Sequence, residues 1–360
     1  MARLGRTNLE VSRIGLGGIP LMKLSSQEAR EVIAASLAGG INFADTAVGY
    51  GDTEEKLSSA FMHGREKFIM ATKSPSRTAK EMAKSIDLSL ARLRTDYIDL
   101  YQVHGLKSVE ELKTILAPQG ALEALKNARK AGKIRFIGVT GHWSSALVEA
   151  IKTGEFDTVM APINVVDRES EEELLPLARR MDIGIIAMKP VCGGTLDEPA
   201  LGIRFCLNAI TDTVLVGMKS IAEVEANLET ANRFKPLTET ELDELLVNAR
   251  QLGKTFCRRC EYCQPCPEGI NIPKILWLAN YHRRYAERDP WTEYEYSSLG
   301  VTAADCQECG ECEERCPYDL PIREMLKDAG RELLPTRKVI ARRKIKHVAK
   351  KILPYRKIDT

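Results

Sequence analysis

Short apolar runs alternate with longer amphipathic stretches between residues 11 and 232. The runs have the length and composition of buried strands, and they cover residues 12–16, 41–44, 68–72, 97–103, 134–140, 158–164, 184–189 and 213–218. Between them apolar residues recur at helical spacing, as in 26–38, 78–93, 171–180 and 221–231. Ser25 and Ser170 are each followed three residues later by a glutamate, which predicts capped first turns for two of these helices.

Eight strands that are each followed by a helix predict a (β/α)8 TIM barrel. The main alternative is a doubly wound sheet, which would carry a G-x-G-x-x-G turn after its first strand. The corresponding residues here are Leu16-Gly17-Gly18-Ile19-Pro20, which do not match that pattern. In a barrel, functional side chains gather at the C-terminal ends of the strands.

Three successive predicted strands end on residues that suit proton transfer. Asp45 closes the second strand and Tyr50 follows in the next loop, Lys73 lies at the end of the third strand, and His104 at the end of the fourth. A free tyrosine has a pKa of about 10, and an ammonium group beside it stabilises the phenolate and lowers that pKa. A carboxylate would keep the lysine charged, and a histidine could orient a substrate oxygen. The four residues together predict carbonyl reduction.

The arrangement Asp45-(x4)-Tyr50-Gly51, with a lysine and a histidine on the next two strands, resembles the catalytic tetrad of the aldo-keto reductase family. The resemblance extends over residues 3–232 and includes the opening segment 4–18, which in the family forms a hairpin before the first strand. It implies a nicotinamide cofactor, NADP or NAD, bound across the barrel mouth. The cofactor-side positions that it implies are Thr140, Asn164, Lys219, Ser220 and Asn227.

Several positions depart from the family pattern. Gly141 follows Thr140 where the family often has Ser-Asn, Met160 replaces a common glutamine, and Met188 stands where an aromatic ring is usual. Glu223 occupies a position where Gln or Arg is usual. Because a 2′-phosphate favours Arg or Lys and disfavours an acid, these residues leave the choice between NADP and NAD open.

Eight of the ten cysteines form two tight motifs beyond residue 255. The first has the spacing C-x2-C-x2-C-x2-C-P and the second C-x2-C-x2-C-x3-C-P, which is the bacterial ferredoxin spacing. A chain without an export signal is expected to use such cysteines for metal rather than for disulfides. Thiols at every third residue suit a [4Fe–4S] cube better than the alternative, a four-coordinate zinc ion.

In the ferredoxin pattern, the fourth cysteine of each motif ligates the other cluster. This predicts two [4Fe–4S] clusters, one held by Cys257, Cys260, Cys263 and Cys316 and the other by Cys306, Cys309, Cys312 and Cys266. Because the first motif is one residue shorter than the standard, a single cluster remains open. Helical patterns over 238–252, 272–287 and 321–329 complete an α-helical, ferredoxin-like domain. A branch of the aldo-keto reductase family resembles this two-part layout.

We therefore predict a barrel over 1–234, an iron-sulfur domain over 235–330 and a basic amphipathic tail over 331–360. The tail carries 11 Lys and Arg against 2 Asp and Glu, in a chain whose net charge is +2. Such a helix could pack on its own protein, on an acidic redox partner or on an anionic membrane surface, and no motif points to nucleic acid. With no apolar leader and no run of about 18 apolar residues, we expect a cytoplasmic protein.

The sequence thus predicts an oxidoreductase that reduces a small carbonyl, or oxidises the alcohol, with Tyr50 as proton donor. Its clusters would exchange electrons with a redox protein partner. Two alternatives stay open: an electron-transfer protein whose barrel no longer reduces carbonyls, and a reductase whose clusters are structural or redox-sensing. Hydride carries two electrons and a cluster accepts one, so direct transfer between them would need a flavin or radical step, and the sequence carries no flavin motif.

Overall fold

The computed structural model describes residues 1–192, 196, 198–253, 256–257, 263–284, 290–316 and 318–334. The chain divides into two compact units, Met1–Leu246 and Val247–Thr360. The division falls inside helix α10 (Glu239–Gly253), whereas the boundary that we predicted, at 234/235, precedes this helix. The predicted tail lies outside the described residues from residue 335 onward. Within the described part of the chain, no helix is both long and apolar enough to span a bilayer.

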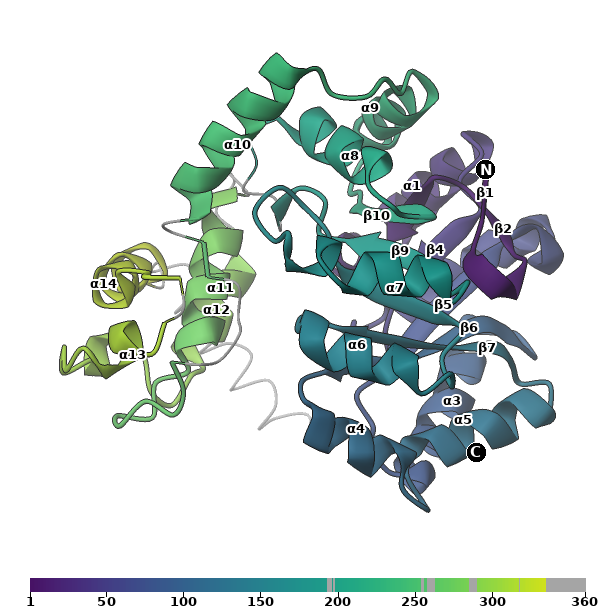
Figure 1. Cartoon of the computed structure of the whole chain (residues 1–360), viewed down its shortest axis with the longest axis horizontal. Helices are drawn as coiled ribbons and strands as arrows, with labels where there is room; N and C mark the ends of the chain where they lie inside the picture. Colours follow the sequence, from purple (N-terminus) through teal and green to yellow (C-terminus); the bar gives the residue numbers. More distant parts are fainter. Residues whose placement is uncertain are drawn as a thin grey trace, which may run out of the picture. The chain divides into compact units, whose positions relative to one another are not determined.

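The first unit is a closed barrel of eight parallel strands in the order β10-β3-β4-β5-β6-β7-β8-β9 (Figure 1). Its first and last strands pair with each other over four residues, from Ile14↔Val214 to Gly17↔Gly217, which closes the sheet. The predicted (β/α)8 barrel is therefore confirmed. The strands are β3 (Ile14–Gly17), β4 (Phe43–Asp45), β5 (Ile69–Ser74), β6 (Ile98–Leu106), β7 (Ile134–Gly141), β8 (Thr158–Pro162), β9 (Gly184–Met188) and β10 (Thr213–Gly217).

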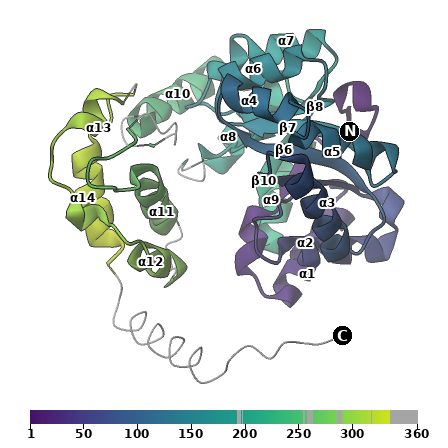
Figure 2. The same ribbon diagram turned by 90° about the horizontal axis from the view of Figure 1, so that it is seen from below.

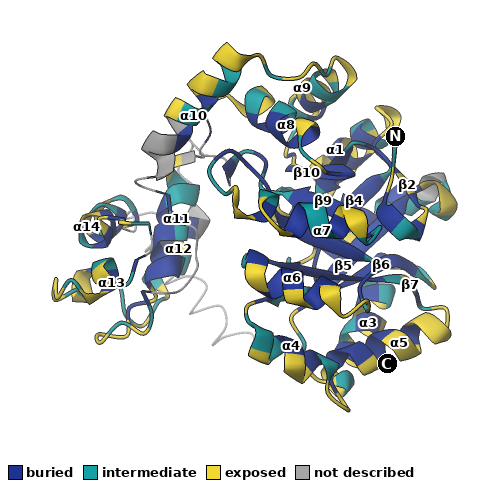
Figure 3. Cartoon of the chain, viewed as in Figure 1, coloured by how far each residue is buried: buried dark blue, intermediate teal, exposed yellow. Residues whose placement is uncertain are grey.

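Helices surround these strands, which lie in the centre of the unit when it is seen from below (Figure 2). The helices bury one side against the strands and expose the other (Figure 3), as their amphipathic patterns require. They are α1 (Ser26–Ala38), α2 (Thr53–Leu57), α3 (Ala79–Leu93), α4 (Val109–Leu116), α5 (Ala121–Lys130), α6 (Ser144–Lys152), α7 (Leu174–Arg180), α8 (Pro199–Asn208) and α9 (Ile221–Asn232).

The two predicted helix caps have different outcomes. Ser25 forms a full capping box with Glu28 at the start of α1, as predicted. The prediction for Ser170 is wrong, because this residue lies in a 3-10 turn and α7 begins only at Leu174. The buried Ser170 hydroxyl instead lies 2.9 Å from the hydroxyl of Ser144, the first residue of α6. A tertiary hydrogen bond has taken the place of the local one that the sequence pattern favoured.

A short N-terminal hairpin precedes the barrel, in line with the family resemblance. Its strands β1 (Ala2–Arg3) and β2 (Glu10–Val11) pair antiparallel. Leu4 is fully buried and packs in one cluster with residues from the barrel interior. Gly5 has a φ of +46°, and a Cβ there would lie 2.2 Å from the backbone nitrogen of Gly184. Because β9 begins at Gly184, the hairpin lies against the N-terminal end of the barrel, opposite the end where active sites form.

The second unit is helical. Besides the C-terminal part of α10, its described elements are α11 (Ile272–Arg284), α12 (Pro290–Ser297), the 3-10 turn Ala303–Asp305, α13 (Glu311–Glu314) and α14 (Ile322–Glu332). A core formed mainly by residues of α11 and α14 also contains the buried cysteines Cys263, Cys312 and Cys316. Cys257, Cys266 and Cys306 are partly buried and pack against the same core. The small fold therefore brings described cysteines of both motifs to one apolar centre.

Candidate functional site

The four residues of the predicted tetrad come from consecutive parts of the barrel. Asp45 is the last residue of β4, and Tyr50 lies in the loop between β4 and α2. Lys73 lies near the end of β5 and His104 near the end of β6. Because β4, β5 and β6 are neighbours in a parallel barrel, their C-terminal ends meet at one rim.

Asp45 and Lys73 form a buried ion pair, with 4% and 2% of their surface exposed. The Lys73 ammonium also donates to the Thr46 carbonyl at 2.8 Å. Gln102, in the middle of β6, donates from Nε2 to the second oxygen of Asp45 at 2.8 Å. The Asp45 carboxyl is thus bound on both oxygens by neighbouring strands, and the lysine is held in one position.

The charges of this pair follow from burial and from each other. Burial raises the pKa of Asp45, and this rise is opposed by Lys73 and by the hydrogen bond from Gln102. Burial acts to lower the pKa of Lys73, but the Asp45 carboxylate and Tyr50 outweigh it and raise that pKa above its ordinary value. Lys73 therefore stays charged beside the tyrosine, which is the state that stabilises a phenolate.

Tyr50 lies between the lysine and the histidine. The Lys73 ammonium lies 4.9 Å from the centroid of the Tyr50 ring. The rings of Tyr50 and His104 meet edge to face, with centroids 6.1 Å apart and planes at 87°. The structure thus brings all four side chains together at one end of the barrel. Phenol, ammonium, carboxylate and imidazole are groups that can take part in proton transfer to a substrate oxygen.

Residues that sequence patterns did not single out stabilise the loop between β4 and α2, which carries Tyr50. Arg92 on α3 donates to the Val48 carbonyl at 3.1 Å and also contacts the buried Glu54 of α2. Glu54 in turn accepts a hydrogen bond from Thr72, the neighbour of Lys73 on β5. The backbone N–H of Val48 donates to the Lys73 carbonyl at 3.1 Å. The loop that carries the tyrosine is therefore tied to the strand that carries the lysine.

Gln102 is the second contributor that the sequence did not reveal. Strand pairing places Lys73, Gln102, Gly138 and Thr158 in one row across β5 to β8. A Cβ at Gly138 would lie 2.8 Å from the Gln102 side chain, so the glycine leaves the room that this side chain occupies. The Gln102 carbonyl oxygen Oε1 is buried and has no hydrogen-bond partner among the described residues. This row is visible only once the register of the strands is known.

The cofactor-side positions lie at the ends of later strands and at α9. Thr140 on β7 and Asn164 after β8 are buried. The Asn164 amide oxygen accepts the backbone N–H groups of Val166 and Asp167 at 3.0 and 2.8 Å. It also accepts the thiol of Cys192 at 3.4 Å. This amide oxygen therefore accepts three hydrogen bonds, whereas the NH2 group makes one long hydrogen bond, to the Asp167 carboxylate at 3.4 Å, and is the end of Asn164 better suited to a ligand.

Lys219 and Ser220 directly precede α9, with Ser220 as its N-cap, and Asn227 is buried on this helix. The Ser220 hydroxyl accepts the backbone N–H of Glu223, and the Glu223 carboxylate accepts that of Lys219 at 2.9 Å. Partial burial and repulsion by Lys219 lower the pKa of Lys23 to about 8. Two lysines near the start of a helix suit the binding of one phosphate group. The negative charge of the Glu223 carboxylate opposes the binding of a second phosphate group.

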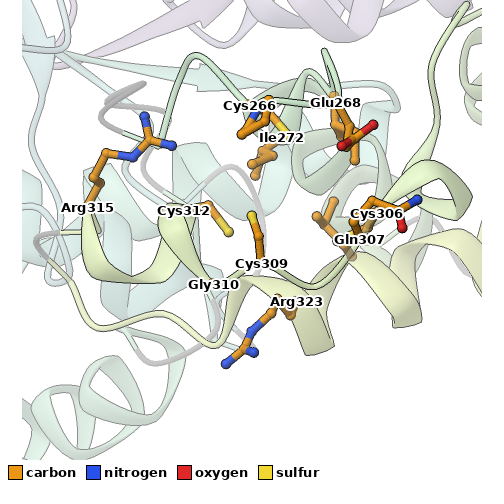
Figure 4. Close-up of a pocket in the computed structure, with 13 residues that line it drawn as sticks. Cys266, Glu268, Ile272, Cys306, Gln307, Cys309, Gly310, Cys312, Arg315 and Arg323 are labelled. Carbon is orange, nitrogen blue, oxygen red and sulfur yellow. The ribbon is translucent and has the colours of Figure 1, made fainter.

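In the second unit, four cysteines line one pocket: Cys266 from the first motif and Cys306, Cys309 and Cys312 from the second (Figure 4). The sulfur atoms of Cys309 and Cys312 point toward the same space, beyond which Cys266 and Ile272 lie (Figure 4). Ile270 and Leu326 add apolar walls. These four cysteines are the set that the ferredoxin spacing predicts for one cluster, and the four sulfurs with an apolar wall fit its chemistry.

The other predicted set is described in part. Cys257 is half-buried and Cys263 and Cys316 are buried, whereas Cys260 lies outside the described residues. Among the residues that the structure describes, no three His, Cys, Asp or Glu side chains group tightly enough to hold one metal ion. What groups Cys266, Cys306, Cys309 and Cys312 is the pocket that they line together.

Two known protein families match successive parts of the chain. The model of the aldo/keto reductase family matches residues 13–202, more than half of the chain. The chain belongs to the aldo/keto reductase family. A second model, a 4Fe-4S dicluster domain, matches residues 256–321. The protein is thus an oxidoreductase of this family with an iron-sulfur domain after the barrel, as the sequence predicted.

The proteins similar to this aldo/keto reductase include a dehydrogenase, a reductase and an uncharacterized oxidoreductase. The chain is 28% identical to L-galactose dehydrogenase of Arabidopsis thaliana in an alignment 307 residues long that covers 69% of this chain and 95% of the relative. It is 32% identical to the NADH-specific methylglyoxal reductase of Escherichia coli over 227 residues, 54% of this chain and 68% of the relative. Identity to the uncharacterized oxidoreductase YqkF of Bacillus subtilis is 30% over 213 residues, 55% and 67% of the two chains.

Solved structures share the barrel. The holo form of aldo-keto reductase AKR11C1 from Bacillus halodurans superimposes with a TM-score of 0.59 at 26% identity, covering 68% of this chain and 95% of that one. An aldo/keto reductase from Klebsiella pneumoniae, solved with NADP and acetate, has a TM-score of 0.56 at 23% identity, covering 68% and 93%. The second similarity shows the fold alone.

Proposed function

We propose that this aldo/keto reductase interconverts a small carbonyl compound and its alcohol, with Tyr50 as the proton donor to the carbonyl oxygen. The observation that supports this most directly is the tetrad geometry, in which a charged lysine lies 4.9 Å from the centre of the tyrosine ring and is paired with a buried carboxylate. Positioned general acids contribute roughly 10²- to 10⁴-fold to a rate.

Each member of the tetrad has a distinct task in this proposal. Tyr50 gives its hydroxyl proton to the oxygen of the substrate carbonyl as that oxygen becomes an alkoxide. Lys73 stabilises the phenolate that remains, and Asp45 keeps Lys73 charged and in place. His104, edge to face with the tyrosine ring, orients the substrate oxygen toward the phenol. In the reverse direction the same phenolate takes the proton from an alcohol.

A nicotinamide cofactor, NADP or NAD, would be held at the barrel mouth by Thr140, Asn164, Lys219, Ser220 and Asn227. When bound, it supplies the hydride that the carbonyl carbon receives. Lys219 and the neighbouring Lys23 would attract a phosphate group. Glu223 at the start of α9 opposes a 2′-phosphate, so the two dinucleotides have to be compared directly.

In the second unit, we propose two [4Fe–4S] clusters. Cys306, Cys309, Cys312 and Cys266 would hold one, consistent with the pocket they line. Cys257, Cys260, Cys263 and Cys316 would hold the other. Such clusters store single electrons, and the fitting partner for this unit is therefore a one-electron redox protein.

Tyr50→Phe tests the proposed acid. The variant keeps the ring but loses the transferable proton, so carbonyl reduction should fall by about 10²- to 10⁴-fold. The assay follows NADPH and NADH oxidation with methylglyoxal and with aldose sugars, on anaerobically purified protein. The matched control is Tyr97→Phe, because Tyr97 precedes β6 and lies under the Arg65 guanidinium, away from the tetrad.

The same preparations report on both cofactors. Iron and acid-labile sulfide per chain should indicate two clusters, and their visible absorbance should be unchanged in Tyr50→Phe. Turnover that Tyr50→Phe leaves intact would refute the proposed acid. A protein that binds neither dinucleotide, yet carries clusters that an external donor reduces, would instead be an electron-transfer protein.

A further inference from the structure

The backbone that carries His104 is irregular. Strand β6 pairs with β7 in register from Ile98 to Val103, but the next pair is Leu106↔Gly141. Between these pairs β6 advances by three residues and β7 by two, so β6 contains one extra residue. Gly105, directly after the histidine, has a φ of +68°. Such bulges can redirect a side chain next to an active site, and this one includes His104, the residue that carries the imidazole.

A single side chain binds the carbonyl groups of this bulge. Arg77, in the loop after β5, donates from one terminal nitrogen to the His104 carbonyl at 2.9 Å and to the Gly105 carbonyl at 3.1 Å. Its other terminal nitrogen donates to the Pro75 carbonyl at 3.0 Å. The two carbonyls lie in the segment where the register shifts, and the guanidinium supplies hydrogen bonds to both of them.

The guanidinium is itself fixed by a carboxylate. Glu111, in the first turn of α4, accepts from the Arg77 Nε at 2.8 Å. The other oxygen of Glu111 accepts the backbone N–H of Lys107 at 2.7 Å. The side chains of Arg77 and Glu111 are 18% and 26% exposed, so this pair is less screened by water than a surface pair. One network therefore joins the loop after β5, the bulge of β6 and the start of α4.

We propose that Arg77 is a positioning residue for His104, which fixes the β6 bulge and thereby sets the direction of the imidazole toward Tyr50 and the substrate oxygen. The proposal rests on the function proposed above only for the task given to the imidazole. The placement of the histidine by Arg77 is a separate claim that can be measured without turnover.

Arginine suits this task better than lysine. Its planar fork offers five N–H donors in fixed directions, and here it binds three carbonyls and one carboxylate at once. A lysine at this position could keep the ion pair with Glu111 but could not reach all of these acceptors. Arg77→Lys should therefore behave between the native protein and Arg77→Gln.

The test compares Arg77→Gln and Arg77→Lys with Arg135→Gln in the full-length protein. Arg135 also pairs with a buried carboxylate, that of Asp99, but it lies at the start of β7, at the other end of the barrel. A misplaced catalytic group can cost on the order of 10²-fold. We expect Arg77→Gln to lower kcat by about 10- to 100-fold with a smaller change in KM, and Arg135→Gln to leave both nearly unchanged.

The second readout is the NMR spectrum of the histidine rings, of which the chain has five. His104→Asn assigns the His104 signal by its loss. Arg77→Gln should move that signal, Arg77→Lys should move it less, and Arg135→Gln should leave it in place. If either Arg77 variant folds and leaves the His104 signal where it was, the proposal is wrong. If the signal moves while Tyr50→Phe retains full turnover, Arg77 still positions His104 and only the proposed function fails.

Discussion

The hydrogen bond from Gln102 to Asp45 gives a sharp test of the tetrad electrostatics. Gln102→Leu removes the Nε2 donor, which lies 2.8 Å from Asp45 Oδ1, and leaves the Lys73 contact in place. Both residues are buried, so no bulk water replaces the lost donor. The carboxylate form of Asp45 loses one of its two stabilising partners, and its pKa should rise further.

The expected changes in the pKa of Asp45 and in the free energy of unfolding follow from the hydrogen-bond partners of Asp45 and Gln102. A hydrogen bond to a charged group contributes about 1.5–3 kcal/mol, so the loss of the Gln102 donor should raise the pKa of Asp45 further above its ordinary value. The same substitution also removes the Gln102 carbonyl oxygen, which is buried without a partner among the described residues. Removing a buried polar atom that lacks a hydrogen bond stabilises the folded state by about 1–3 kcal/mol. The free energy of unfolding should therefore change little while the pKa moves.

The assay is the pH dependence of kcat/KM, whose acid limb reports essential ionisations of the free enzyme. Asp45 has to be ionised to keep Lys73 in place, so activity is present above the Asp45 pKa and is lost as the pH falls through it. A raised pKa moves this limb to higher pH. The control is Gln27→Leu, because Gln27 also donates to a carboxylate, that of Glu31 at 3.1 Å, but on the surface. An acid limb that Gln102→Leu does not move would refute the reasoning.

Two further substitutions test the buried ion pair and the cysteine pocket. Lys73→Met leaves a buried carboxylate unpaired, which should cost about 3–5 kcal/mol in urea unfolding and abolish turnover; Lys133→Met, in an exposed pair at 2.6 Å, should cost less than about 1 kcal/mol. Arg315→Gln removes two hydrogen bonds of 3.2 Å to the Pro265 carbonyl, which link the two cysteine motifs, and should lower iron and sulfide per chain. Arg283→Gln, which breaks an exposed pair elsewhere in the second unit, should leave both contents unchanged.

The fold of the barrel was predictable because its signal is repeated. Eight apolar runs each precede a helical pattern, and all eight correspond to strands of the closed sheet. An error in one segment, such as the cap expected at Ser170, leaves this repetition intact. That cap failed because a buried hydroxyl found a tertiary partner in Ser144. Sequence patterns indicate the local preference of a residue. They do not show which distant residues become its hydrogen-bond partners in the folded protein.

The grouping of the four proposed tetrad side chains was predictable for a related reason. In a parallel barrel, the end of each strand is marked in the sequence by the change from apolar to polar residues, and all such ends share one rim. Asp45, Lys73 and His104 lie at those marked positions. Gln102 and Arg77 do not, because one lies in the middle of a strand and the other in a loop that could carry any polar residue. Their tasks depend on strand register and on a bulge, and neither can be read from spacing.

The proposed hydride chemistry and the proposed single-electron chemistry depend on separate residues. The tetrad lies between Asp45 and His104 in the first unit, and the four cysteines of the pocket lie between Cys266 and Cys312 in the second. The first set suits transfer of a proton beside a two-electron hydride, and the second suits single electrons. No residue is shared, so a substitution in one set leaves the ligands of the other complete.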